Sequence, residues 1–408
     1  MRIPLAAIVL ASCVAAVSAC GGSTAMVGPP GPPSPKPTLP PTSIDNIVQN
    51  NYAGGWGVEL AIYKNGALAY EKGYGLRDRG LPDTFVNQNI WGIEQPDKLF
   101  NMPRGQFAPD AGTAFDLASV SKEFTAGAIL LLQQDGKLSV NDPVSKYFPS
   151  IPSATQITLL DLLNHTSGLV EYNNFGTYPD FTNAYAQFMA SGQTDYQPIV
   201  TALQTFPLLF TPGTQYNYSN TDYVLLGMIV AQVSGEPLGT FMQQRIFGPL
   251  GMTQTHQGYP AAPVTDLALG YAFDGVSIVR TWQWNLQWLA GPGGLTSTVG
   301  DIEKWDEAVR APGIFTQASL TQMFTPCAFP LPYGTYADGW FIATLDGHRY
   351  VWHDGSIGGF ATMNATFPDD DINIVVLVND FTGTDPYYII PQLFPLALTM
   401  HAAPDRRH

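Results

Sequence analysis

A serine and a lysine three residues apart are the pair in this chain best suited to nucleophilic chemistry. Ser119 and Lys122 stand in the segment Ser-Val-Ser-Lys. On a helix, residues three apart share a face, so the hydroxyl and the amine can meet. A serine hydroxyl is a weak nucleophile until a neighbouring group takes its proton, and a lysine can take it where burial lowers the pKa of its ammonium group. The pair alone is a weak signal, because it also occurs at exposed helix starts.

A tyrosine and an asparagine further along the chain can complete such a site. Tyr218, Ser219 and Asn220 come directly before the segment 221–234, which has helical spacing and is followed by Gly235. The Tyr218 phenol can relay a proton, and the Asn220 amide can hold a substrate amide or the lysine. The alternative is a turn in which Asn220 only caps the following helix.

A third segment, His353-Asp354-Gly355-Ser356, lies between two strand-like runs near the C-terminus. Gly355 would let the backbone approach a ligand closely, and the Ser356 N–H could donate a hydrogen bond to an oxyanion. An ordinary hairpin turn is the alternative.

Taken together and in this order, the three segments resemble the serine β-lactamase and penicillin-binding protein superfamily. The likeness is strongest to its class C, D,D-carboxypeptidase and family esterase branch, which pairs Ser-x-x-Lys with Tyr-x-Asn and a Lys/His-Thr-Gly triplet. The segments 162–169 and 293–298 are also similar to recurrent stretches of that branch. The resemblance covers essentially the whole chain from Trp56 onward.

The resemblance implies a role for each matching residue. Ser119 becomes the nucleophile, Lys122 its activator and Tyr218 the general base or proton relay. Which of Lys122 and Tyr218 takes the proton stays open. Asn220 becomes a contact for the substrate and the lysine.

The far wall of the expected site comes from the third segment. The resemblance implies that His353 lines this wall, that Gly355 and Ser356 bind substrate, and that the backbone N–H groups of Ser119 and Ser356 form an oxyanion hole. Here the chain departs from the family pattern, because Asp354 stands where the threonine of the triplet would be. A carboxylate pointing inward would repel a substrate carboxylate, and a neutral histidine attracts it less than a lysine.

We therefore expect a serine hydrolase that acts through an acyl-enzyme on a carboxylic ester or amide, of the esterase or D-amino-acid peptidase type. The alternatives are a true β-lactamase and a low-turnover penicillin-binding or cell-wall-sensing module. No cofactor is expected, since the six histidines show no zinc spacing. The substrate is a small molecule or peptide, and the oligomeric state stays open.

Three further features are weaker candidates. His165 stands beside a threonine and a serine but is expected to be a satisfied core histidine. The tryptophans at 282, 284 and 288 could line an apolar cleft or belong to the core. Cys327 is the one cysteine in the segment 42–408, and we expect it to be a small buried hydrophobe.

The N-terminus predicts export. Residues 1–19 have a positive start and an apolar run typical of a signal peptide, and small residues before Cys20 resemble a lipoprotein processing site. A plain secretory signal is the alternative. Residues 20–41 then form a proline-rich tether, so the chain is expected to be periplasmic or at the cell surface, anchored to a membrane through lipid on Cys20.

Composition and element order predict the fold class of residues 42–408. The chain of 408 residues is 45% hydrophobic, enough for a packed core, and its net charge of -15 argues against nucleic acid as a partner. Strand patterns at both ends enclose a mostly helical middle. This order predicts an α+β fold in which N- and C-terminal strands form one antiparallel sheet flanked by helices, with an inserted helical lobe, as in β-lactamases and transpeptidases.

Overall fold

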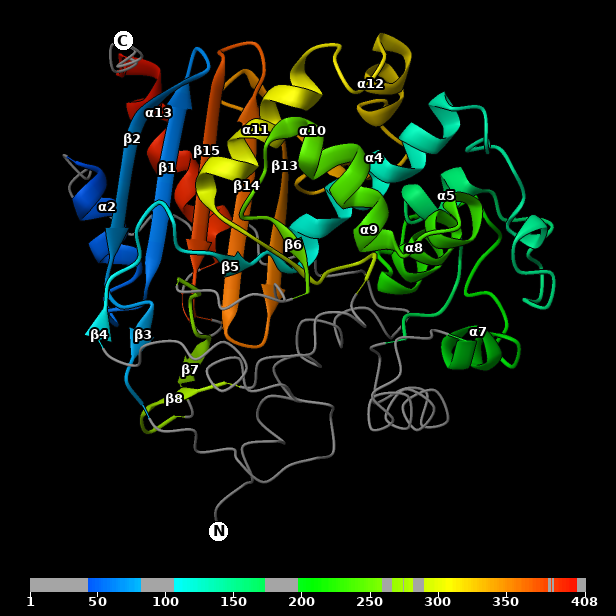
Figure 1. Cartoon of the computed structure of the whole chain (residues 1–408), viewed down its shortest axis with the longest axis horizontal. Coiled ribbons are helices and arrows are strands. Elements are labelled where there is room, and N and C mark those ends of the chain that lie inside the picture. Colours follow the sequence, from blue (N-terminus) through cyan, green and yellow to red (C-terminus); the bar gives the residue numbers. More distant parts are fainter. Residues whose placement is uncertain are drawn as a thin grey trace.

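A computed structural model of the chain describes residues 43–81, 106–172, 197–258, 266–273, 275–281, 290–380, 383 and 385–401. Its centre is an antiparallel sheet of eight strands in the order β10-β11-β12-β13-β14-β15-β1-β2 (Figure 1). The strands are β1 (Val58–Lys64), β2 (Ala67–Tyr74), β10 (Pro330–Leu331), β11 (Gly334–Ala337), β12 (Trp340–Leu345), β13 (His348–Ile357), β14 (Phe360–Phe367) and β15 (Ile372–Val378).

The sheet joins the two ends of the chain, as the sequence predicts. An Asn-Gly turn closes the first hairpin, because Asn65 and Gly66 have φ values of 53° and 67°, the left-handed conformation that such a turn requires. Strand β1 then pairs with β15 from Val58 opposite Val378 to Lys64 opposite Ile372. The expected α+β architecture is confirmed.

Two hydrophobic layers cover the faces of this sheet. Every residue of β15 is buried, and alternate side chains point to opposite faces. Ile374 and Val376 pack in one layer with α2 (Ile44–Asn51) and α13 (Ile390–Thr399). Val375 and Leu377 pack in the other layer with α11 (Val299–Arg310) and α4 (Ser121–Gln134).

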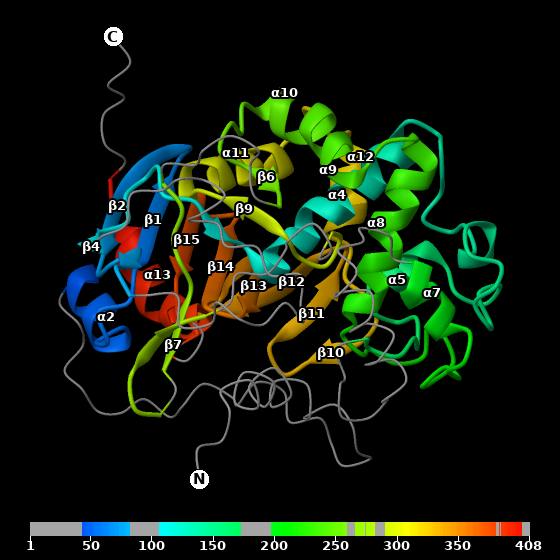
Figure 2. The same cartoon turned by 60° about the horizontal axis from the view of Figure 1, so that its bottom comes forward.

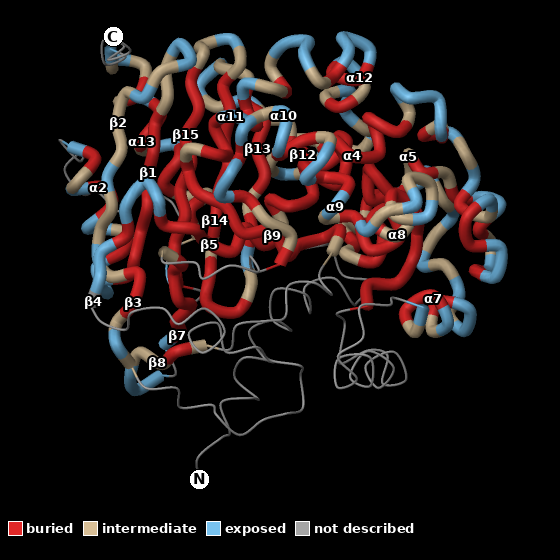
Figure 3. The backbone as a smooth tube through the Cα atoms, in the orientation of Figure 1, coloured by how far each residue is buried: buried red, intermediate tan, exposed pale blue. Residues whose placement is uncertain are grey.

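The inserted helical lobe lies at the β10–β12 edge of the sheet, opposite the N-terminal hairpin (Figure 2). Its central helix is α4, in which every residue from Ser121 to Leu132 is buried, so it is a core helix on all sides (Figure 3). The other helical segments of the described chain are η3 (Val144–Lys146), α5 (Leu159–Leu163), α7 (Gln197–Leu203), α8 (Asn220–Ser234), α9 (Leu238–Met242), η4 (Gln243–Phe247), α10 (Gly248–Leu250), α12 (Gln317–Met323) and η6 (Pro386–Ile389).

The described residues also form three small sheets. Strand β5 leads directly into the η2 turn (Ala118–Val120) and α4, and it pairs with β9. The small sheets are β3 (Asp78–Arg79) with β4 (Gln106–Phe107), β5 (Phe115–Asp116) with β9 (Leu295–Ser297) and β6 (His256–Gln257), and β7 (Tyr271–Phe273) with β8 (Ile278–Arg280).

The predicted elements hold with three corrections. The helix expected from Ser119 begins as the η2 turn and becomes α-helical at Ser121. The segment from Tyr387 to Met400 has the apolar pattern of one closing helix, which the structure divides into η6 and α13. The residues His353 to Ser356 lie within β13, so the hairpin-turn alternative is wrong, and the turn follows at residues 358–359.

Several expectations fall outside the described residues and stay predictions. They are the signal peptide, the lipidated Cys20, the proline-rich tether and the three tryptophans at 282, 284 and 288. Within the described ranges no single helix has the length and apolarity to cross a bilayer. One pair, α8 with the segment Leu238–Leu250, passes by length and composition together but bends by 72°.

A buried layer of carboxyl groups joins α4 and α11 to the sheet. The Asn364 side chain on β14 donates hydrogen bonds to Glu123 Oε2 (3.1 Å) and Asp306 Oδ1 (2.8 Å). The Trp305 indole donates to the same oxygen of Glu123 (2.9 Å). Burial raises the pKa of Glu123 well above its usual range and that of Asp306 to about 7. Both groups therefore favour the neutral acid, which costs less to bury than a carboxylate.

This layer predicts that stability falls as the pH rises. Between about pH 4 and 7 the unfolded chain loses the Asp306 proton while the folded chain keeps it. Each such proton contributes a slope of up to about 1.4 kcal/mol per pH unit. Asp306→Asn removes this titration and keeps the acceptor for Asn364, so its free energy of unfolding in urea should depend less on pH. Asp369→Asn, at an exposed carboxyl, is the control. Equal slopes for wild type and Asp306→Asn would contradict this account.

Candidate active site

Ser119 is presented by a strained turn between β5 and α4. Ala118 has a φ of 47°, in the left-handed region that costs a non-glycine residue about 1 kcal/mol. The buried Asp116 side chain stabilises this turn by accepting the Ala118 N–H at 2.9 Å. The turn leaves Ser119 partly exposed just before the first residue of α4, next to the positive end of the helix dipole.

Lys122 is completely buried beneath Ser119. Its Nζ lies 2.9 Å from Ser119 Oγ, 2.8 Å from Asn220 Oδ1 and 2.8 Å from the Pro292 carbonyl oxygen. In the described part of the chain no carboxylate forms an ion pair with this amine. The sequence prediction that Ser119, Lys122 and Asn220 meet is therefore confirmed.

Burial lowers the pKa of Lys122 to about 7, against a weaker opposing effect of the Glu171 and Asp354 carboxylates. A large share of the amine is consequently neutral near neutral pH. Asn220 Oδ1 and the Pro292 carbonyl oxygen can only accept hydrogen bonds. They therefore accept the two that the N–H groups of the neutral amine donate. The third direction, toward Ser119 Oγ, is then occupied by the nitrogen lone pair. Neutral Lys122 is therefore oriented to receive the Ser119 proton.

Tyr218 lies over the same amine. Lys122 Nζ is 4.8 Å from the centre of the Tyr218 ring. Burial raises the pKa of Tyr218 well above its usual value, although a hydrogen bond with the Ser119 side chain opposes the rise. The phenol is thus protonated at neutral pH. A protonated Tyr218 is suited to relay a proton. It is less suited to take the first proton from Ser119, which would require a phenolate.

Asn220, the first residue of α8, connects the lysine to Glu171. Its Nδ2 donates to Glu171 Oε1 (3.4 Å), and its backbone N–H donates to Glu171 Oε2. Sequence reasoning did not identify Glu171, which no motif marks. It also missed Pro292, because a backbone carbonyl leaves no signal in residue type. Gly291 aims this carbonyl: its φ is 109°, and a Cβ there would lie 2.1 Å from the Tyr223 carbonyl oxygen.

The opposite wall of the site is the end of β13. There β13 pairs with β14 as far as Ile357, whereas its pairing with β12 ends at Trp352. Among the described strands, the last five residues of β13 therefore have one edge without a partner strand. A Cβ on Gly355 would lie 2.3 Å from the Leu117 carbonyl oxygen and 3.0 Å from the Ser119 nitrogen. Only glycine allows this approach, which brings the edge carrying the exposed Ser356 beside the Ser119 N–H.

His353 supports this wall from inside. Its side chain is 1% exposed, and burial lowers its pKa to about 3. Nδ1 lies 2.6 Å from the Asp354 carbonyl oxygen and must donate to it, so Nε2 accepts the Tyr336 hydroxyl at 3.1 Å. Both ring nitrogens are thus engaged within the protein. The expected direct contact of His353 with substrate stays a prediction, and the structure gives it a packing role.

Asp354 carries less charge than the sequence suggests. Its side chain is 36% exposed. Partial burial, and then the neighbouring Asp385 carboxylate, raise the pKa of Asp354 to about 7. Its repulsion of a substrate carboxylate should therefore grow as the pH rises through neutrality.

The remaining candidates lie away from this chemistry. Cys327 packs against the hydrophobic layer that contains α2 and α13, with Sγ 4.0 Å from the Phe329 carbonyl oxygen, but it is less buried than expected. His348 contacts Asp370 while His353 contacts Tyr336, as their positions on opposite faces of β13 predict. No group of three or more His, Cys, Asp or Glu residues in the described ranges is arranged to hold a metal ion.

Comparisons with known proteins agree with this geometry. The family model described as Beta-lactamase matches residues 44–389. The Bacillus subtilis protein PbpX, provisionally named a penicillin-binding protein, is 29% identical over 321 residues, which cover 78% of this chain and 69% of that protein. The match to this chain spans 69% of the length of PbpX and 62% of the length of two other curated relatives.

Two solved structures are similar over most of the chain. The octameric penicillin-binding protein homologue from Pyrococcus abyssi has a TM-score of 0.70 at 25% identity, covering 87% of this chain and 76% of that one. The D-amino acid amidase from Ochrobactrum anthropi has a TM-score of 0.65 at 26% identity, covering 86% of this chain and 94% of that one.

The close packing at Gly355 gives a direct prediction. Gly355→Ala should push the end of β13 away from the Ser119 N–H and lower kcat/KM about 100-fold, the usual cost of one lost oxyanion donor. Gly313→Ala is the matched control, because a Cβ at Gly313 meets no atom within 4 Å. Steady-state kinetics on an activated ester, with urea unfolding of both variants, measures the effect. Equal activity of the two variants would rule out the proposed wall.

Proposed function

This chain belongs to the β-lactamase family of serine hydrolases, and from that premise we propose that it hydrolyses carboxylic esters and amides through an acyl-enzyme on Ser119. The observation that carries the proposal is the buried Lys122 amine, 2.9 Å from Ser119 Oγ and with a pKa of about 7. A lysine at this pKa can take the serine proton near neutral pH.

The reaction begins with proton transfer from Ser119 Oγ to neutral Lys122. Oγ attacks the substrate carbonyl carbon, and the resulting oxyanion accepts hydrogen bonds from the Ser119 and Ser356 N–H groups. The Tyr218 phenol donates its proton to the leaving alcohol or amine and regains one from Lys122. The tetrahedral intermediate then collapses to a Ser119 ester. Water attacks this ester by the reverse proton route and releases the acid.

Two observations favour small amides and esters of D-amino acids as the first substrate class to test. The similar Ochrobactrum structure is that of a D-amino acid amidase. The chain also carries Asp354 where the family triplet has a threonine that helps to bind a substrate carboxylate. Amides and esters of amino acids lack the free carboxylate that this residue would repel.

The penicillin-binding relatives support a second candidate, a module that is acylated by β-lactams but turns them over slowly. The two candidates share Ser119 as the acylated residue. They differ in the rate at which water hydrolyses the Ser119 ester.

A substrate panel separates these possibilities. Wild type should turn over D-phenylalanine amide or a short-chain p-nitrophenyl ester. It should turn over L-phenylalanine amide and nitrocefin more slowly, and Ser119→Ala should turn over none of these substrates. Asp354→Thr should raise nitrocefin turnover relative to the ester. Fast nitrocefin turnover by wild type would make the chain a β-lactamase. A stable mass increase on Ser119 with penicillin, without ester or amide turnover, would favour the binding module. Equal activity of wild type and Ser119→Ala would contradict both.

A further inference from the structure

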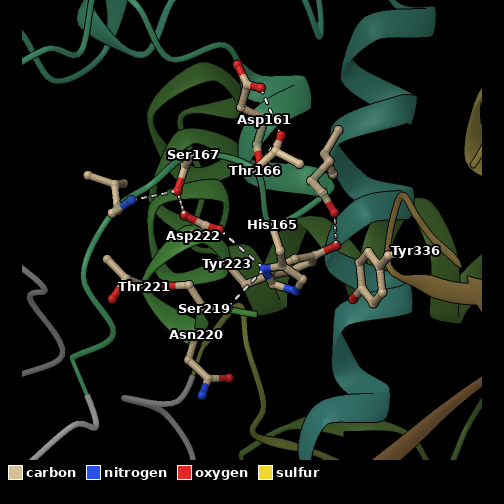
Figure 4. Close-up of polar contacts among 12 residues, drawn as sticks. Asp161, His165, Thr166, Ser167, Ser219, Asn220, Thr221, Asp222, Tyr223 and Tyr336 are labelled. Carbon is tan, nitrogen blue, oxygen red and sulfur yellow. Dashed lines mark hydrogen bonds and ion pairs between the residues drawn. The ribbon is translucent and has the colours of Figure 1, made fainter. Parts of the chain in front are cut away.

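We propose that His165 is a positioning residue for the reaction, which holds Tyr218 in place by binding the backbone on both sides of it. The His165 carbonyl accepts the Asn217 N–H at 2.8 Å. Its Nδ1 accepts the Ser219 N–H at 3.2 Å (Figure 4). Its ring contacts the Tyr218 ring with the ring centres 4.4 Å apart. Three separate contacts thus fix the one residue that connects Ser119 to the leaving group in the proposed mechanism.

The backbone of His165 is set for this task. The residue is completely buried, and its φ is 58°, a left-handed conformation that histidine and asparagine adopt more readily than most residues. The adjoining chain is tied to α8 as well. Tyr223 donates to the Leu163 carbonyl at 2.9 Å, and Thr221 donates to the Val170 carbonyl at 2.7 Å. The segment around His165 and the start of α8 therefore form one hydrogen-bonded unit.

The hydrogen bonds assign the proton on each partner. A backbone N–H can only donate, so Nδ1 of His165, which faces the Ser219 N–H, is unprotonated and the ring carries its proton on Nε2. Asp222 Oδ2 lies 3.2 Å from the same Nδ1. Two acceptors would repel at this distance, so Asp222 is the neutral acid, and its O–H shares the single Nδ1 lone pair with the Ser219 N–H. Its other oxygen accepts the Ser167 hydroxyl at 2.6 Å.

Burial is consistent with this assignment. It raises the pKa of Asp222 well above its usual range and lowers the pKa of His165. Electrostatic interactions with Lys122 and His353 lower the pKa of His165 further. Serine, aspartate and histidine are all present here, but in an order that excludes a catalytic triad. The Ser167 hydroxyl binds the aspartate rather than the imidazole, so no base activates it. The cluster is a support built of neutral groups.

Substitutions at His165 separate the side-chain contact from backbone freedom. His165→Asn places an amide oxygen near the position of Nδ1 and tolerates the positive φ. His165→Gly tolerates the same φ but offers no acceptor. We expect kcat/KM of His165→Asn to stay within about 3-fold of wild type, and kcat of His165→Gly to fall 10- to 100-fold with a smaller change in KM. Equal losses in the two variants would overturn the proposal.

Substitutions at Asp222 test the neutral acid. Asp222→Asn keeps a donor for Nδ1 and an acceptor for Ser167, so its kcat/KM should stay within about 3-fold of wild type. Asp222→Leu removes both and should lose at least 10-fold. Loss in Asp222→Asn equal to that in Asp222→Leu would show that Asp222 acts as a charged partner.

The kinetic effects of these variants rest on the proposed function. The tautomer of His165 does not, so measuring it tests this proposal separately. Long-range ¹H–¹⁵N spectra of wild type, with His165→Asn to assign the signal among the six histidines, report the tautomer directly. We expect His165 to be neutral with its proton on Nε2 from pH 5 to 9. A proton on Nδ1, or an imidazolium, in the folded wild-type chain would overturn the proposal, whether or not that chain is active.

Discussion

The site depends on burying one amine with hydrogen-bond acceptors around it and no carboxylate paired to it. A lysine in water holds its proton up to a pH near 10, and it becomes a useful base only where desolvation opposes the charge. The Asn220 amide oxygen and the Pro292 carbonyl solvate Lys122 enough to keep it buried. An ion pair at the same place would stabilise the ammonium form and prevent the chemistry.

The rest of the structure keeps this arrangement rigid from three directions. From below, α4 is buried on every side and joined to the sheet through neutral Glu123. From the lobe, His165 holds the backbone next to Tyr218, and Glu171 holds Asn220 at the start of α8. From the sheet, Gly355 brings the β13 edge against the Ser119 backbone. Two of these supports, Glu123 and His165, are titratable groups whose burial favours the neutral form, which costs less to bury than a charged one.

The sequence reveals those parts of the site that residue type determines. Ser119, Lys122, Tyr218 and Asn220 were predictable because each carries a functional group at a recognisable spacing. The sequence places His353 to Ser356 between two strand-like runs, whereas these residues belong to β13. Their polar pattern is not typical of a strand, because this part of β13 is paired on one edge only. The contribution of Pro292 comes from its backbone, and those of Glu171 and Asp222 depend on contacts across the fold. No local pattern records such contacts.

The titration of the Lys122 ε-amine tests the central claim most directly. Lysine labelled with ¹³C at Cε, in the full chain with Lys122→Met to assign the signal among eight lysines, gives this pKa without any substrate. We expect a midpoint near pH 7 for Lys122. We also expect that the midpoint is unchanged in Ser119→Ala, because desolvation causes the shift. A midpoint near 10 would show that the amine stays charged at neutral pH and cannot take the Ser119 proton.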